Sequence, residues 1–110
     1  MNLLQETIEI LKQNGKSEND VLFVMDNDTL LKNTWEWFKE NAKDIEYDEG
    51  YGHEEINCCI KVVGKDFWLE RNSYDGSEWW NFKSMPEEPE NVGDFNLLDS
   101  YEMYCRGLQK

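Results

Sequence analysis

The chain has 110 residues, enough for one domain that buries about two-thirds of the surface exposed in its unfolded form. Hydrophobic residues make up 39% and aromatic residues 14%, so a wholly disordered chain is not expected. Eleven basic residues against 24 acidic ones give a net charge of −13, which repels the phosphates of nucleic acids and anionic lipid headgroups. Composition therefore predicts a single domain over residues 1–110 and favours basic proteins as partners.

Cysteine and histidine usage argues against disulfides and metal sites. The three cysteines, Cys58, Cys59 and Cys105, are odd in number and lack C-x-x-C spacing. His53 is the single histidine, so no zinc site and no cofactor are expected. Because the chain has no apolar leader and no long apolar run, we expect a cytoplasmic protein with reduced thiols.

The first predicted element is a helix. Asn2 can cap it, with Gln5 completing a capping box, and Leu4, Ile8 and Leu11 form one apolar stripe. Gly15 is a suitable left-handed stop.

A short buried strand and a second helix are predicted next. The apolar run 21–25 is too short for a helix and indicates a strand. The polar residues 26–28 can then cap a helix that runs to about residue 43, with Leu31, Trp35, Phe38 and Ala42 at helical spacing. Residues 44–48 suggest a further short strand.

The central block, residues 54–83, predicts a meander of three antiparallel strands. Alternation at Ile56, Cys58, Ile60 and Val62 is typical of a half-buried strand. Gly64-Lys65 fits a type II′ hairpin loop and Asp75-Gly76 a type I′ loop. These loops predict one apolar face, with the cross-strand pairs Val62–Phe67, Ile60–Leu69, Cys58–Arg71, Leu69–Phe82 and Arg71–Trp80.

The opposite face of this meander carries Trp68, Tyr74 and Trp79 among polar side chains. Either a later helix covers these aromatic residues or they contact a partner, because tryptophan and tyrosine are enriched at binding hot spots.

After Pro86 and Pro89 the sequence predicts an acidic loop, and then a C-terminal helix from Asp94 with apolar or tyrosine residues at positions 97, 101, 104 and 108. The expected class is therefore α+β: an antiparallel sheet of three to five strands packed on two N-terminal helices, plus a C-terminal helix. The predicted core contains Leu4, Ile8, Leu11, Leu31, Trp35, Phe38, Ile56, Ile60, Val62, Leu69, Trp80 and Phe82.

One string has a catalytic appearance. The sequence VLFVMDNDTLL, with Asp26 and Asp28 after an apolar strand, resembles the first motif of haloacid-dehalogenase-type phosphatases. That resemblance implies Asp26 as nucleophile and Asp28 as general acid/base beside Mg²⁺. The chain is short for the parallel core of that family, and the same residues suit a helix cap, so this small phosphatase-like enzyme is the alternative reading.

Acidic residues are concentrated in two blocks without any lysine or arginine, residues 44–55 and 84–105. Rows of carboxylates can replace phosphates in a basic groove, as a DNA mimic does, while a solubilising surface explains the same charge more simply. The predicted partner-binding residues are Asp44, Glu46, Asp48, Glu49, Glu54, Glu55, Glu87, Glu88 and Glu90, with Trp68, Tyr74 and Trp79 as anchors.

The segment WLERNSYDGSEWWNFKSMP, residues 68–86, resembles small acidic proteins of bacteria, phages and mobile elements. The resemblance carries no catalytic residues, and it implies an inhibitor of the anti-CRISPR or immunity-protein kind. The leading expectation is thus a non-enzymatic protein that binds and inhibits a basic, nucleic-acid-binding protein. A small-ligand-binding domain is a further alternative.

Overall fold

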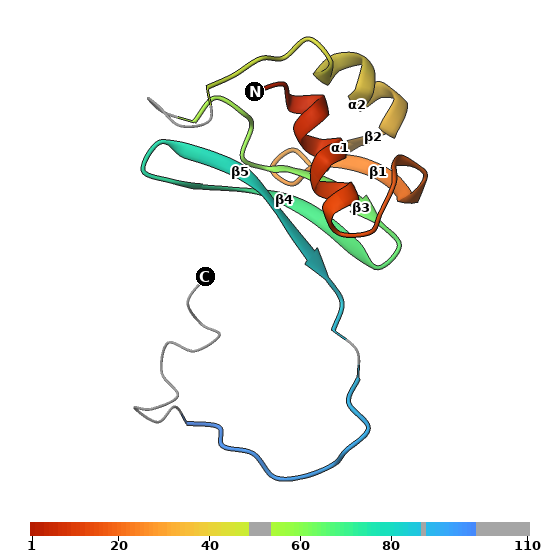
Figure 1. The fold of residues 1–110 in the computed structure, drawn as a ribbon, viewed down its shortest axis with the longest axis vertical. Coiled ribbons are helices and arrows are strands. Elements are labelled where there is room, and N and C mark those ends of the chain that lie inside the picture. The colour runs from red at the N-terminus through yellow and green to blue at the C-terminus, as the bar shows by residue number, and fades with distance from the viewer. Residues whose placement is uncertain (49–53, 87, 99–110) are drawn as a thin grey trace.

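The fold is described from a computed structural model for residues 1–48, 54–86 and 88–98 (Figure 1). A five-stranded antiparallel sheet has the order β2-β1-β3-β4-β5, and its strands are β1 (Val21–Asp26), β2 (Leu31–Asn33), β3 (Ile60–Gly64), β4 (Phe67–Tyr74) and β5 (Ser77–Ser84). The helices are α1 (Leu3–Gln13) and α2 (Trp35–Ala42), and one 3₁₀ turn, η1 (Glu18–Asp20), precedes β1. The predicted α+β class, with its antiparallel sheet and two helices, is confirmed.

Helix α1 forms as its sequence predicts. The Asn2 side chain accepts a hydrogen bond from the Gln5 backbone N–H at 3.0 Å, and Gly15 takes the left-handed φ of 74° beyond the C-terminal end. Leu3, Thr7 and Leu11 are the buried residues of the helix, and the predicted Leu4 and Ile8 are partly buried against the same core. In the part of the chain that the structure describes, no helix is long and apolar enough to cross a membrane.

The predicted second helix begins much too early. Residues 26–33 instead form the β1–β2 hairpin, in which Leu30 adopts a left-handed φ of 62°. Helix α2 begins only at Trp35, where the Thr34 hydroxyl accepts a hydrogen bond from the Trp37 N–H at 3.0 Å. Leu31 was therefore wrongly placed in the core: it lies on the edge strand β2 and is 69% exposed.

The meander is present, but its first strand and first hairpin differ from the prediction. Residues 54–59 are not a strand, because Asn57 forms a turn in which its side chain accepts a hydrogen bond from the Cys59 N–H at 2.9 Å. Val62 pairs with Leu69 rather than with Phe67, so the predicted pairs Ile60–Leu69 and Cys58–Arg71 are also wrong. The slip is an even number of residues, so the predicted apolar face is unchanged.

The second hairpin follows the prediction residue by residue. Leu69 pairs with Phe82 and Arg71 with Trp80, and the loop residues Asp75 and Gly76 both have positive φ, as a type I′ turn requires.

The predicted C-terminal helix does not begin at Asp94. Residues 94–98 are irregular and exposed, and the rest of that prediction, residues 99–110, lies outside the described residues. The segment 44–48 forms a single antiparallel bridge between Glu46 and Asn2 instead of a strand.

The core lies between one face of the sheet and the two helices (Figure 1). Val24, Val62, Leu69 and Trp80 contribute from the strands, and Trp35 and Phe38 contribute from α2 as a stacked pair with ring centroids 5.3 Å apart. Ile56, Ile60 and Phe82 pack against this core as partly buried residues. The predicted core lacked five residues that are buried in the structure: Leu3, Val24, Ala42, Tyr47 and Phe67.

A substitution at Gly64 tests the packing of the core around Phe67. A Cβ atom there would lie 2.0 Å from the Phe67 ring, so we expect Gly64→Ala to displace the ring and lower the free energy of unfolding by about 1–3 kcal/mol. Urea unfolding of Gly93→Ala is the matched control, since a Cβ at Gly93 meets nothing within 4 Å. Equal midpoints for the two variants would contradict this account of Gly64.

Candidate functional site

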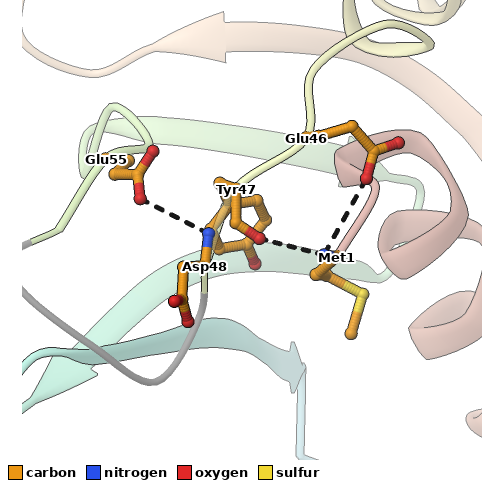
Figure 2. Close-up of a pocket in the computed structure, with 5 residues that line it drawn as sticks. All are labelled: Met1, Glu46, Tyr47, Asp48 and Glu55. Carbon is orange, nitrogen blue, oxygen red and sulfur yellow. Dashed lines mark hydrogen bonds and ion pairs between the residues drawn. The ribbon is translucent and has the colours of Figure 1, made fainter.

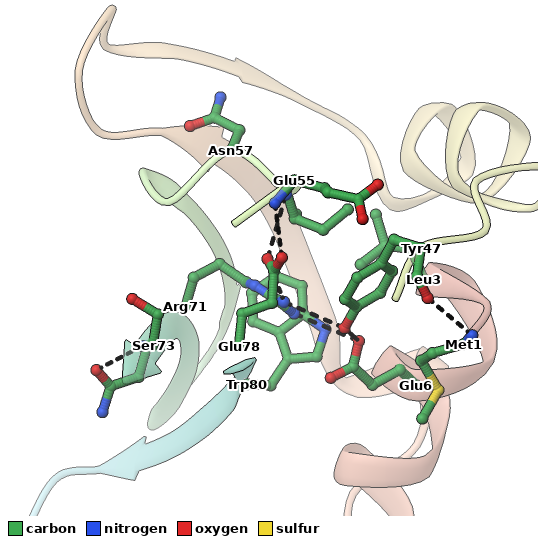
Figure 3. Close-up of polar contacts among 12 residues, drawn as sticks. Met1, Leu3, Glu6, Tyr47, Glu55, Asn57, Arg71, Ser73, Glu78 and Trp80 are labelled. Carbon is green, nitrogen blue, oxygen red and sulfur yellow. Dashed lines mark hydrogen bonds and ion pairs between the residues drawn. The ribbon is translucent and has the colours of Figure 1, made fainter. Parts of the chain in front are cut away.

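A buried ionic cluster connects the sheet, α1 and the segment 44–48 (Figure 3). Its centre is the Arg71 side chain, which is 2% exposed and points from β4 toward the helices. The guanidinium donates to Glu78 at 3.1 Å and to the Tyr47 hydroxyl at 3.2 Å, and it lies 3.4 Å from Glu6. It also packs over the Trp80 ring, 4.7 Å from its centroid.

The same cluster holds backbone segments in place. The Glu78 carboxylate, 3% exposed, accepts hydrogen bonds from the N–H groups of Glu55 at 2.6 Å and Ile56 at 3.2 Å. Tyr47 donates its hydroxyl hydrogen to Glu6 of α1. Two segments without regular structure are therefore bound to this cluster: 44–48 through the contact of Tyr47 with Arg71, and 54–56 through Glu78. Both carry residues of the first acidic block.

Three residues of the first acidic block lie around one shallow recess (Figure 2). Glu46, Asp48 and Glu55 line it together with Tyr47 and Met1. The Met1 ammonium group donates to the Tyr47 carbonyl oxygen at 2.9 Å and lies 3.9 Å from Glu46, and the Asp48 N–H donates to Glu55 at 3.3 Å. Glu54 lies instead at a smaller recess beside Arg71, Asp44 is exposed near the end of α2, and Glu49 is outside the described residues.

The second acidic block lies on a separate element. After β5 the chain leaves the sheet as an irregular segment that Figure 1 shows leading away from the strands. Glu88, Glu90 and Asp94 are exposed on it, and Glu87 is outside the described residues. Four large apolar side chains lie on the same segment and are 79–101% exposed: Val92, Phe95, Leu97 and Leu98. This combination of acids with exposed apolar side chains is unusual for the surface of a folded protein.

The predicted aromatic anchors share the face of the sheet opposite the helices. Because side chains alternate along a strand, Trp68 in β4 and Trp79 in β5 point away from the face that holds Leu69 and Trp80. Both indole rings are half-buried; the Trp68 N–H donates to Glu70 at 2.9 Å and the Trp79 N–H to Asn81 at 3.1 Å. Tyr74 lies on the same face near the hairpin end and is 78% exposed.

We call this surface the open face, because the hydrophobic core lies on the other side of the sheet. The strand registers place on it, besides the three aromatic anchors, the residues Phe23, Met25, Lys32, Lys61, Val63, Glu70, Asn72, Asn81 and Lys83. Three of these residues are lysines and one is a glutamate, although acidic residues outnumber basic ones by more than two to one in the whole chain.

Asp26 occupies the hairpin turn. Its carboxylate accepts hydrogen bonds from the N–H groups of Asp28 at 2.8 Å and Thr29 at 3.3 Å, and from the Asn57 side chain at 3.0 Å. These bonds, led by the one from Asp28, lower the pKa of Asp26. The carboxylate thus stabilises a turn between antiparallel strands, which is neither the predicted helix cap nor the strand-to-helix setting of the phosphatase motif. A groove of about 470 Å³ opens beside it toward Trp37 of α2.

Sequence reasoning missed the ionic cluster. A single arginine on a strand carries no periodic signal, and Tyr47 lies in a segment that looked like a solvated acidic stretch. One signal was available: Arg71 was predicted on the apolar face of the meander, where a charge requires a buried partner. Within the described ranges, no three histidine, cysteine or acidic side chains gather closely enough to hold a metal ion.

Comparison with protein-family models, with curated proteins and with solved structures finds no match for this chain.

The ionic cluster predicts a large loss of stability when its cation is removed. We expect Arg71→Met to lower the free energy of unfolding by about 3–5 kcal/mol, because the buried Glu78 then lacks its charge partner. Lys83→Met is the control, since it removes an exposed pair with Glu70 at 4.0 Å and is expected to cost at most about 1 kcal/mol. Similar urea midpoints for both variants would show that Arg71 is dispensable.

The buried Tyr47 phenol predicts that the stability of the protein depends on pH in the alkaline range. Burial, and then the hydrogen bond to Glu6, raises the pKa of the Tyr47 phenol far above its ordinary value of 10.0. The contribution of Tyr47 to stability is complete below pH 10.0 and declines above it, because the unfolded chain then releases a proton that the folded chain keeps. Above pH 10.0 the free energy of unfolding should therefore fall more steeply with pH in the natural chain than in Tyr47→Phe. The two slopes should differ by up to about 1.4 kcal/mol per pH unit. Parallel curves for the two proteins would contradict the shift.

Proposed function

We propose that this chain is a non-enzymatic protein that binds a basic, nucleic-acid-binding protein and blocks its nucleic-acid site. The observation that carries this proposal is the segment 88–98, which combines exposed carboxylates with the exposed side chains of Val92, Phe95, Leu97 and Leu98. We call it the acidic arm. Exposed apolar side chains of this size are unfavourable in water, and their burial against a partner contributes about 1.5–3 kcal/mol each.

The chemistry of the acidic arm defines the partner surface that suits it. An apolar groove bordered by lysine or arginine would accept the four apolar side chains and pair with Glu88, Glu90 and Asp94. Grooves that hold nucleic acid combine basic residues with apolar or aromatic ones, so a nucleic-acid-binding protein fits this description. Carboxylates of the arm would then replace phosphates.

The recess lined by Glu46, Asp48 and Glu55 also favours a basic partner. It gathers carboxylates around a concave surface, which suits a lysine or arginine side chain. The net charge of −13 would raise the rate of association with a basic partner at low salt.

Charge reversal on the acidic arm tests the proposal. A fraction of host proteins that bind heparin is passed over the immobilised chain, and we expect retention that falls at least tenfold between about 0.05 and about 0.5 M salt. Added duplex DNA should release the retained protein. With the Glu88→Lys/Glu90→Lys variant immobilised, we expect retention of the basic protein to fall at least tenfold, because the introduced lysines repel its basic groove.

The matched control is Glu9→Lys/Glu36→Lys, which changes the net charge equally at two exposed helical positions away from the arm. This control should retain the protein nearly as well as the natural chain. The proposal is wrong if retention resists both salt and DNA, or if the two double variants behave alike.

A further inference from the structure

The open face and the acidic arm are two surfaces of one chain that each lack a described partner. A one-sided antiparallel sheet normally presents polar side chains to water. Here the outward side chains include Phe23, Met25, Val63, Trp68 and Trp79, and all of them are half-buried, so part of each remains open to a further contact.

We propose that the acidic arm docks on the open face of its own chain, so that the arm has a bound and a released state. The structure describes the released state, in which the arm is exposed. In the docked state the carboxylates of the arm, those of Glu88, Glu90 and Asp94, pair with Lys32 and Lys61. The apolar side chains of Phe95, Leu97 and Leu98 cover the aromatic side chains of the open face.

Charge complementarity selects this occupant. The open face carries Lys32, Lys61 and Lys83 against Glu70 alone, while residues 84–105 contain no lysine or arginine. Lys32 lies over the Phe23 ring, 5.9 Å from its centroid, so the face presents cationic and apolar groups together, as the arm presents acidic and apolar groups together.

The position of the arm makes the contact possible within one chain. The chain leaves the sheet after Ser84, next to the cross-strand row Val63–Trp68–Lys83, and the Met85 N–H still donates to the Asp66 carbonyl oxygen at 3.1 Å. From β5 to β1 the row spans about 14 Å at the usual strand spacing, while residues 85–95 can extend about 35 Å. A tether of this length gives the arm an effective concentration in the millimolar range at the face.

This docking deepens the proposed function. A basic partner that binds the arm would compete with the open face for it. Only a partner that binds the arm more tightly than the open face does would then displace it. The docking itself needs no partner, and a test on the purified chain alone separates its failure from a failure of the proposed function.

Zero-length carbodiimide cross-linking of the full chain provides this test, because it joins only a lysine and a carboxylate in ion-pair contact. We expect cross-links from Lys32 or Lys61 to Glu88, Glu90 or Asp94 in the monomer. The pair Lys39–Glu18, 3.4 Å apart in the structure, is the internal positive control. The proposal is overturned if this control cross-links and no link between the face and the arm forms.

Two further measurements exclude other occupants. Phe95→Ser/Leu97→Ser/Leu98→Ser should reduce the cross-links between face and arm at least fivefold and increase acrylamide quenching of tryptophan fluorescence. Leu30→Ser, a comparably exposed leucine on the β1–β2 turn, should change neither. In an equal mixture of ¹⁴N- and ¹⁵N-labelled chains, cross-links of mixed isotope would assign the arm to a second copy and overturn docking within one chain.

Discussion

The buried charge of Arg71 is the constraint on which the rest of the structure depends. A guanidinium that is removed from water at the centre of a small domain must be neutralised, and Glu78 and Glu6 supply the charge from β5 and α1. Because Glu78 also accepts two backbone hydrogen bonds, the same requirement fixes the path of residues 55–56. One buried cation thereby orders a helix, a hairpin and two irregular segments.

This arrangement explains how irregular acidic segments can present a defined surface. Residues 44–48 have few regular backbone bonds, yet Tyr47 is buried between Arg71 and Glu6 and holds the segment down. The neighbouring Glu46 and Asp48 are consequently positioned at the recess (Figure 2). The acidic side chains at the recess are thus held in place by an ionic cluster whose central Arg71 is buried.

The extent of correct sequence prediction varies between elements for identifiable reasons. The β4–β5 hairpin was predictable because Asp75 and Gly76 both satisfy the positive φ of one turn type. The first hairpin loop was misplaced because Gly64 was interpreted as a residue chosen for its backbone freedom, whereas it leaves room for the Phe67 ring. Leu31 has helical spacing with Trp35, Phe38 and Ala42, but it lies outside the helix. The Asp26 carboxylate bonds to the turn, and Thr34 caps α2 later. Local hydrogen bonds of short polar side chains decided where α2 begins, and hydrophobic periodicity does not reveal such bonds.

The division of the sheet into two faces also changes what the net charge means. Acidity averaged over the whole chain suggests a uniformly repulsive surface, whereas the registers collect Lys32, Lys61 and Lys83 on one face, and the described acids of the two acidic blocks lie on other elements. A lysine and a carboxylate in contact can therefore attract each other within the molecule, because the energy of a contact pair depends mainly on nearby charges. A distant anion is still repelled, because it interacts with the net charge of the whole chain. If the arm docks as we propose, a partner that binds it must be basic enough to approach the chain and must also displace Lys32 and Lys61 from the arm.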